Sequence, residues 1–566
     1  MTGWARIAMA LAPQDPRAGW YRECLAHAGV RAEQLHEWVP AELSRTHVCL
    51  IAGIGKLTPA QREGLRSWVE QGGNLVLAGS PMELEELLGH VPGSSKRRPV
   101  GYVTPVGKDR LWPDDAPKIK ALGLTTVVAK GAHVVAECGG QPVVTRHRYG
   151  QGWATYVGID LGLTSELMAL GRSVECDAIG PDDPSVHLDD GVLRAEDGIA
   201  LSFESDRTTV GNHPSFFGDA WVDLSREVWL RAVFEAIERT GKATPIAWYW
   251  PNAAQGAASL TLDVRDHEVD RVVAMQRMLS MYGCSATWLV PMPGYSTDVY
   301  RALRAMEHEV GLLFNVDEPN GWHDDRLRIQ FTNLIRLASW PHMGTVRVQH
   351  GQWKGWTHFY DVCEAAGGRV SVNKGGRQAA TAGFAFGTCH PFHPVRKDGR
   401  ERLVLEVPYH LWAPGESVSE DVAVDVINRV AARNGCLGFS LNPDAMNDPA
   451  VSAAVRRVLM TCKEQRLVFL KSDDLAKFER GRRHLRVTTK QVGESGWIQL
   501  GSEIEMSGLT LMLPGTGYTI LDRKRVLKPQ TIQAFGTTFT AVTIDIPAMT
   551  LVDLEWTQAA GSRQVA

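Results

Sequence analysis

The pattern of hydrophobic and polar residues changes along the chain, and its first segment, residues 1–165, alternates short apolar runs with amphipathic stretches. The run HVCLIAG at 47–53 is typical of a buried parallel strand. The stretch LTPAQREGLRSWVEQGG at 57–73 carries an apolar stripe with Thr58, a good helix cap, at its start, and the run NLVLAGSP at 74–81 is the next strand. Strand, helix and strand in this order predict a right-handed crossover and a parallel sheet.

Residues 166–250 have a less regular pattern. The stretch VHLDDGVLRAEDGIALSF at 186–203 indicates short strands joined by Asp-Gly turns. The stretch 223–241 has one apolar face and ends in Gly241, so it predicts a helix. We interpret this segment as an irregular connecting region.

Residues 251–482 return to repeated strand–helix units, which predict a (β/α) barrel. In SLTLDV the aliphatic side chains point to one side of the strand, and Asp263 lies with Ser259 and Thr261 on the other. A carboxylate at the end of a barrel strand is a typical catalytic position.

From residue 483 to 566 short strands alternate with Gly and Pro turns, which predicts a β-sandwich. The sequence therefore predicts an α/β multidomain protein. It consists of a parallel-sheet domain (1–165), the connecting region (166–250), a (β/α) barrel (251–482) and a C-terminal β-sandwich (483–566).

The composition of the chain limits the kinds of partner that it can be expected to bind. The chain has 44% hydrophobic and 22% charged residues and a net charge of -4, with no basic stripe, so we expect no nucleic-acid partner. It has no apolar run long enough for a signal peptide or a membrane span, so we expect a cytoplasmic protein without membrane contact. The nine cysteines include no CxxC pair, and we expect them to be reduced.

The phrases EQGGNLVLAGSP and YGQGWATYVGIDLG make residues 1–165 resemble the class I glutamine-amidotransferase-like domain that accompanies some glycosidases. That family's chemistry needs a nucleophilic cysteine on a glycine elbow. The segment has no G-x-C-x-G, and we interpret Ser80 as a helix cap. The resemblance therefore implies a scaffold, with a homo-oligomer formed through this domain left open.

The barrel segment resembles the polysaccharide deacetylases, the NodB-homology family. SLTLDV stands where that family has T-F-D-D, YGCSATWLV where it has G-x-x-A-T-F-F-V, and MEHEVGLL where it has G-H-E-I-G-x-H. Further along the chain, VRVQHG stands where the family has R-x-x-x-G, and GFSLNP stands where it has Leu-x-His. These segments occur in the same order as the family's motifs. The resemblance implies a hydrolase that removes acetyl groups from an N- or O-acetylated sugar.

The family's site can be checked residue by residue. Asp263 matches its general base and Arg347 the arginine that orients the base. The acidic metal ligand is replaced by Val264, the first histidine ligand by Leu313, and the second by Asp317. Hydrocarbon side chains cannot ligate a metal, so we expect no tightly bound metal at the usual site. In addition, the late catalytic histidine is replaced by Asn442, which cannot act as an acid at neutral pH.

Other residues could rebuild a divalent-metal site. His350, or the pair His390 and His393, could ligate a metal with Asp266 or Asp317. Each has an alternative: Asp266 suits a helix cap, and the two paired histidines suit loop hydrogen bonds. We take His350 as a further catalytic candidate. The candidates for substrate binding are His390, His393 and Glu406, the last of which could instead pair with an arginine.

Two functions remain open at this point. One is a carbohydrate deacetylase-type hydrolase with a strongly altered metal site. The other is a catalytically inactive relative that serves as a glycan-binding or assembly scaffold. In both, the expected partner is a carbohydrate.

Overall fold

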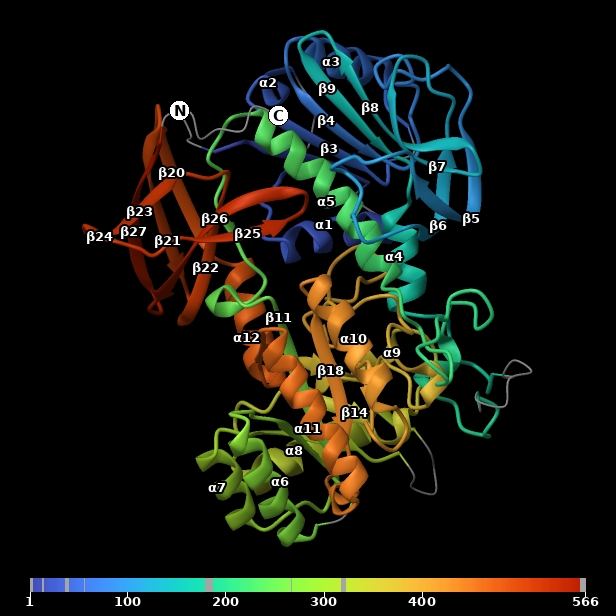
Figure 1. The fold of residues 1–566 in the computed structure, drawn as a ribbon, viewed down its shortest axis with the longest axis vertical. Coiled ribbons are helices and arrows are strands. Elements are labelled where there is room, and N and C mark those ends of the chain that lie inside the picture. Colours follow the sequence, from blue (N-terminus) through green and yellow to red (C-terminus); the bar gives the residue numbers. More distant parts are fainter. Residues whose placement is uncertain are drawn as a thin grey trace.

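The computed structural model describes residues 4–12, 15–35, 40–54, 56–178, 186, 188–265, 267–316 and 322–559. It is a mixed α/β protein in which the described residues form four sheets (Figure 1). Two sheets have nine strands each, and the other two have four and five. None of the helices in the described residues is long and apolar enough to cross a bilayer.

The first sheet has the strand order β2-β1-β3-β4-β9-β8-β7-β5-β6. Strands β2, β1, β3, β4 and β9 run parallel, which confirms the predicted parallel pairing, and β8, β7, β5 and β6 extend the sheet in antiparallel fashion. The strands are β1 (Ile7–Leu11), β2 (Glu33–Gln34), β3 (Val48–Ala52), β4 (Asn74–Ala78), β5 (Lys96–Pro105), β6 (Ile119–Thr126), β7 (His133–Cys138), β8 (Gln141–Tyr149) and β9 (Gly152–Val157). The helices are α1 (Pro16–His27), α2 (Pro40–Leu43), α3 (Pro59–Glu70) and α4 (Leu161–Ala169). Thr58 and Gln61 form a reciprocal capping box at the start of α3, as the sequence indicated.

The prediction of short strands at 186–203 is wrong for the described residues there, which contain a 3-10 turn at Ala195–Gly198 and no strand. The Asp197 carboxylate accepts from the Arg194 backbone N–H at 2.6 Å, and Asp190 binds the Arg194 side chain. These local hydrogen bonds between side chains and the backbone take the place of the hydrogen bonds that would pair two strands. The predicted helix is confirmed as α5 (Trp221–Arg239). It packs against β3, β4, β6 and β9 (Figure 1).

The second nine-stranded sheet is entirely parallel, with the order β16-β15-β14-β13-β12-β11-β18-β17 and β19 paired with β11. The strands are β11 (Gly256–Asp263), β12 (Thr287–Val290), β13 (Glu309–Phe314), β14 (Thr345–Val348), β15 (Val370–Ser371), β16 (Leu405–Glu406), β17 (Leu411–Trp412), β18 (Cys436–Leu441) and β19 (Leu467–Phe469). The helices are α6 (Val269–Met281), α7 (Thr297–Ala305), α8 (Asp324–Ala338), α9 (His358–Ala366), α10 (Glu420–Ala432), α11 (Pro449–Glu464) and α12 (Ser472–Arg483). In the described residues β16 and β17 do not pair, so the sheet is a parallel half-barrel, which agrees only in part with the expected (β/α) barrel.

The remaining two sheets are antiparallel, with orders β10-β22-β26-β25 and β20-β21-β27-β23-β24. The strands are β10 (Ile246–Ala247), β20 (Arg486–Val492), β21 (Ser495–Ser502), β22 (Met506–Pro514), β23 (Tyr518–Asp522), β24 (Arg525–Val526), β25 (Gln530–Ala534), β26 (Thr537–Ile546) and β27 (Thr550–Gln558). Buried side chains of both sheets, among them Leu500, Leu511 and Leu554, form one apolar cluster between them. β10 comes from the connecting region and pairs with β22.

One large apolar core runs through most of the molecule. It includes Ile7 of the first sheet, Trp229 of α5, Leu260 of the half-barrel and Phe539 of β26. On α5, the Phe234 ring stacks on Phe535 with centroids 4.6 Å apart. The segments therefore pack against one another through α5, and the boundaries at 165, 250 and 482 remain predictions.

Candidate functional site

Asp263 and Arg347 lie together near the carboxyl ends of β11 and β14. The Arg347 Nη1 donates to Asp263 Oδ1 at 2.8 Å and to Ser440 Oγ of β18 at 2.5 Å. Its Nε donates to the Val372 carbonyl at 2.7 Å. Since both side chains are almost fully buried, at 10% and 3% exposure, this is a fixed ion pair. Their proximity confirms the expectation that both residues lie at the same end of the sheet.

Two aromatic rings accompany this ion pair. The Arg347 guanidinium carbon lies 4.7 Å from the ring centre of Tyr409 and 5.7 Å from that of Trp412. On β17, Trp412 is the register partner of Ser440, and the Arg377 guanidinium lies 4.5 Å from its ring centre. Cations over aromatic faces are favourable contacts. This end of the half-barrel therefore combines one carboxylate, two guanidinium groups and two rings.

Two of the three positions that hold a metal in the resembling family, those of Leu313 and Val264, are apolar in this structure. Leu313 is 3% exposed and Val264 2% exposed. Leu313 is the register partner of Arg347 on the neighbouring parallel strand, so both side chains point to the same face of the sheet. Hydrocarbon therefore occupies the place of a ligand. These residues do not fit the family's metal.

Asn442 has a local structural contact. Its Oδ1 accepts from the Asp444 backbone N–H at 3.1 Å and caps the short turn Pro443–Asn447. Its Nδ2 is buried without a hydrogen-bond partner among the described residues. Since an amide cannot release a proton at neutral pH, Asn442 cannot supply the acid of the family's mechanism.

His350 is exposed and lies in a short 3-10 turn directly after β14, at φ 57°. Its carbonyl accepts a hydrogen bond from Arg194 Nη1. Among the described residues, the group of potential metal ligands that lie near one another is Asp223, Cys389 and His390, and it excludes His350. Asp266 and Asp317, the other candidate ligands, lie outside the described residues.

His390 and His393 do not lie beside Asp263, which corrects the sequence-based placement. The Cys389 carbonyl accepts from the Cys436 N–H at 2.7 Å, and Cys436 begins β18 and pairs with Ala257. Asp263 lies six residues beyond Ala257 along β11, which corresponds to about 20 Å of strand. The 388–394 loop therefore lies at the opposite, amino end of the sheet, where His393 Nδ1 contacts the Arg402 carbonyl at 2.9 Å.

Glu406 is fully buried and pairs with no arginine among the described residues, so the predicted arginine pair is wrong, while its contact with a substrate stays a prediction. Its carboxylate accepts from the backbone N–H groups of Asn373 at 2.9 Å and Lys374 at 2.8 Å. It also accepts from the hydroxyl of Tyr360 at 3.1 Å and from that of Ser371. Burial raises its pKa. Glu406 therefore fixes the chain that follows β15.

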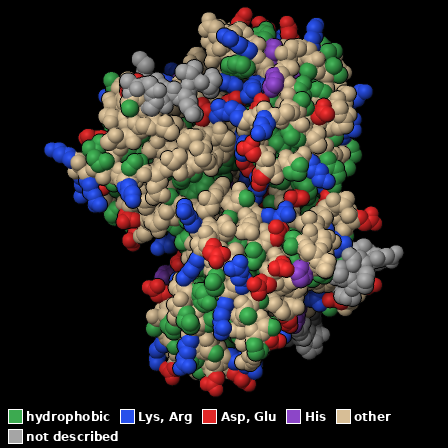
Figure 2. Space-filling model, viewed as in Figure 1, with side chains coloured by type: hydrophobic (Ala, Val, Ile, Leu, Met, Phe, Trp, Pro, Cys, Tyr) green, Lys and Arg blue, Asp and Glu red, His purple; other side chains and the backbone are tan. Residues whose placement is uncertain are grey.

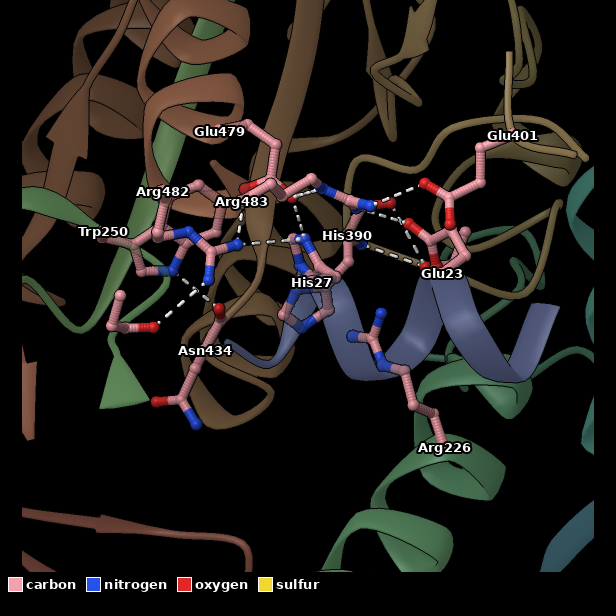
Figure 3. Close-up of polar contacts among 12 residues, drawn as sticks. Glu23, His27, Arg226, Trp250, His390, Glu401, Asn434, Glu479, Arg482 and Arg483 are labelled. Carbon is pink, nitrogen blue, oxygen red and sulfur yellow. Dashed lines mark hydrogen bonds and ion pairs between the residues drawn. The ribbon is translucent and has the colours of Figure 1, made fainter. Parts of the chain in front are cut away.

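A buried polar network joins α1, the 388–394 loop and α12 (Figure 3). His27 Nδ1 lies 2.8 Å from Glu479 Oε1, and His27 Nε2 lies 2.9 Å from His390 Nδ1. Arg482 and Arg483 both donate to Glu479. Burial alone would raise the pKa of Glu479, but Arg482, with His27 and Arg483, holds it well below its usual range. Sequence reasoning missed this network because its members are far apart in the chain.

The group Asp223, Cys389 and His390 has ligand atoms within 4.8 Å of one another, but these atoms are already engaged. Asp223 accepts from Thr388 Oγ1 at 2.6 Å and from the Cys389 N–H at 2.7 Å. His390 Nε2 contacts the Arg433 carbonyl at 3.0 Å, and burial raises the pKa of the Cys389 thiol. With the Arg226 guanidinium 3.5 Å from Asp223, these residues do not favour a cation.

The chain matches no known protein family and none of the curated proteins. Solved structures similar to parts of it include a Mycobacterium smegmatis protein assigned as a polysaccharide deacetylase, with 15% identity over 42% of this chain and 95% of that one, at TM-score 0.31. A β-galactosidase from Bacillus circulans sp. alkalophilus has 18% identity over 28% of this chain and 30% of that one, at TM-score 0.24. An exo-β-1,4-mannosidase from Opitutaceae bacterium strain TAV5 has 18% identity over 28% and 32%, at TM-score 0.23.

The chain thus spans about a third of the length of each of these two glycosidases. TM-scores this low assign neither a fold family nor a function to it.

Proposed function

We propose that this chain is a carbohydrate-binding relative of the polysaccharide deacetylases that no longer performs metal-dependent deacetylation. The observation that carries the proposal is the combination at the carboxyl ends of β11, β13 and β14. The Asp263–Arg347 pair is present there, while Leu313 and Val264 are buried hydrocarbon at the positions of two ligands. A deacetylase of this type needs its metal to polarise the acetyl carbonyl and activate water.

The remaining residues favour recognition of a sugar. Trp412 and Tyr409, 8% and 5% exposed, place two aromatic rings next to the donors of Arg347 and Arg377, and protein sites for sugars combine rings with hydrogen-bonding groups. In this proposal Asp263, held by Arg347 and Ser440, accepts a hydrogen bond from a sugar hydroxyl. The segment 1–165, resembling an amidotransferase-like domain, acts as scaffold.

One observation favours a second candidate, a hydrolase that acts without the metal. The contacts of Asp263 with Arg347 and Ser440 involve Oδ1, and Oδ2 makes no hydrogen bond to the described residues. A carboxylate with one free oxygen can act as a general base. This candidate would release acetate slowly in the presence of a chelator.

The test combines acetate release with calorimetric binding of N-acetylglucosamine oligomers to the full chain. We expect no acetate release above background with or without added zinc, and saturable binding that Trp412→Ala weakens at least tenfold. Trp340→Ala is the matched control, because Trp340 also stacks with an arginine, Arg304 at 4.5 Å, but lies outside this site. Zinc-dependent acetate release would contradict the proposal, and chelator-resistant release that Asp263→Asn abolishes would favour the second candidate.

A further inference from the structure

A cleft of about 560 Å³ lies where several parts of the chain meet. Its walls come from the 108–115 segment that follows β5, one face of α5, the end of α10 and the turn between β25 and β26. Figure 2 shows a hollow between these parts, with acidic and basic side chains around it. The volume is within the range of small-molecule sites, roughly 300–1,000 Å³.

The face of α5 that lines the cleft is polar. Its lining residues, Asp223, Arg226, Glu227, Leu230 and Arg231, have the i, i+3, i+4 spacing of a single helix face. Buried polar side chains are normally hydrogen-bonded. Lining groups that lack a hydrogen bond therefore indicate the chemistry of a ligand that the cleft could bind.

Arg226 has an ion-pair partner but no hydrogen bond of its own among the described residues. It is 6% exposed and lines the cleft, and its ion pair with Asp223 has a separation of 3.5 Å. The two Asp223 oxygens already accept from Thr388 and Cys389. The Arg226 guanidinium makes no hydrogen bond within the described residues. In Figure 3 it points from α5 toward His27 and His390 and has no dashed contact with the residues drawn.

Tyr249 is the second unsatisfied donor. It is 4% exposed and lines the same cleft, and its hydroxyl has no hydrogen-bond partner in the described part of the chain. Its ring lies beside that of His390, with centroids 4.9 Å apart, and near Phe535 at 5.9 Å. A hydroxyl donor and an apolar surface therefore adjoin the guanidinium.

The carboxylates of the cleft are mostly neutralised. Glu227 accepts from Arg231 at 2.7 Å and from Arg433 at 3.0 Å. Asp109 pairs with Arg146 at 2.9 Å, and Asp115 pairs with Arg433. At the exposed mouth Lys108 and Asp114 have opposite charges. Asp223, 3.5 Å from Arg226, also lines the cleft, and both of its oxygens accept hydrogen bonds from Thr388 and Cys389.

We propose that this cleft binds a small organic anion, with its carboxylate or phosphate group on Arg226 and Tyr249 and its carbon skeleton beside Phe535. A charge-assisted hydrogen bond from arginine is the interaction that such a group forms best. Because the walls come from separate parts of the chain, the bound anion bridges them, and it stabilises the folded protein by mass action. The site lies at the amino end of the half-barrel and is independent of the carbohydrate function.

The test is isothermal titration of the full chain with three probes: inorganic phosphate, glucose 6-phosphate and glucuronate, with glucose as the neutral control. We expect saturable one-to-one binding of at least one anion and none of glucose. A phosphate preference over glucuronate identifies a phosphorylated ligand, and the reverse identifies a carboxylate. The melting temperature should rise with the bound probe.

Arg226→Lys should weaken binding of that probe at least tenfold, because lysine loses the planar fork of donors. Tyr249→Phe removes a single hydroxyl and should weaken it several-fold. Arg239→Lys is the matched control: it is also an α5 arginine paired with a carboxylate, Glu235 at 3.1 Å, but it does not line the cleft. The proposal is overturned by the absence of anion binding, or by equal affinity in wild type and Tyr249→Phe even if Arg226→Lys fails to fold.

Discussion

Arg347 reaches across from β14 to Asp263 at the end of β11 and holds its Oδ1 at 2.8 Å, while the same nitrogen contacts Ser440 on β18. The pair thus ties together strands that are not neighbours in the sheet, since β12 and β13 lie between β11 and β14. A buried carboxylate and guanidinium held in this way position each other even where no metal is bound.

The first prediction follows from the burial of this pair. Asp263→Ala should lower the free energy of unfolding by about 3–5 kcal/mol, because it leaves a buried guanidinium without its counter-charge. The double variant Asp263→Leu with Arg347→Leu should lose less free energy of unfolding, because neither charge is left buried alone. Denaturant unfolding measures both. The exposed pair Asp298–Arg301 is the control, with Asp298→Ala costing less than about 1 kcal/mol; similar costs at the two sites would refute the fixed-pair interpretation.

The second prediction concerns Glu479. Glu479→Ala should destabilise the protein by about 3–5 kcal/mol, because Arg482 and Arg483 lose the carboxylate that they share. Ordinarily a surface change costs little, so Glu503→Ala at the exposed pair with Arg486 serves for comparison. Thermal and denaturant unfolding report the difference, and a loss below about 1 kcal/mol for Glu479→Ala would show that the network is not needed.

The third prediction is a pH dependence. His410 Nδ1 accepts from the Gly438 N–H at 3.1 Å and its Nε2 lies 3.2 Å from the Thr388 carbonyl, so the neutral ring is satisfied. Burial lowers its pKa to about 4. Between pH 6.5 and 4 the unfolded chain therefore binds a proton that the folded chain does not, and stability falls as the pH falls.

His410→Asn keeps an acceptor toward Gly438 and removes this titration. Unfolding free energies of both proteins are measured between pH 7 and 4.5. Below pH 6.5 the slope of free energy against pH should be smaller in the variant than in wild type by up to about 1.4 kcal/mol per pH unit. An unchanged slope in the variant would mean that His410 can be protonated in the folded protein.

The fourth prediction concerns residues 1–165. The three cysteines of this segment, Cys24, Cys49 and Cys138, are buried, and burial raises the pKa of the Cys24 thiol and brings that of Cys49 to about 12. A thiol that stays protonated is a poor nucleophile. A glutamine-analogue electrophile should therefore label no residue in this segment, as mass spectrometry of the treated protein would show. Stoichiometric labelling there, together with glutaminase activity, would contradict the scaffold role.

Local sequence patterns predicted much of the fold. The apolar run 47–53, the capped helix after Thr58 and the alternation in SLTLDV appear as β3, α3 and β11, because burial and capping act within a few residues. The meeting of Asp263 with Arg347 was also predicted, through the resemblance in their motifs. The half-barrel's open edges and the 3-10 turn at Ala195–Gly198 were not, since they depend on contacts that local patterns do not contain.

The errors in the candidate site have a common cause. His390 and His393 follow β15 in the chain, and proximity in sequence suggested the same end of the sheet as Asp263. The long connection between β15 and β16 instead returns to the amino end, where His390 meets His27. Glu406 was predicted to bind substrate or pair with an arginine, because sequence does not show the four donors that enclose it. The Arg226 cleft is built from several distant segments and has no local signal beyond the charged face of α5.

We propose that the deacetylase-type metal site has been lost, and metal analysis of the wild-type protein and one restored variant tests this loss most directly. Zinc and nickel are titrated into wild type and into the double variant Val264→Asp with Leu313→His, and anomalous scattering locates any bound ion. We predict no tightly bound ion beside Asp263 in wild type, because two ligand positions are hydrocarbon, and a stoichiometric ion there in the double variant. A stoichiometric ion at the carboxyl end of β11 in the wild-type protein would contradict this prediction.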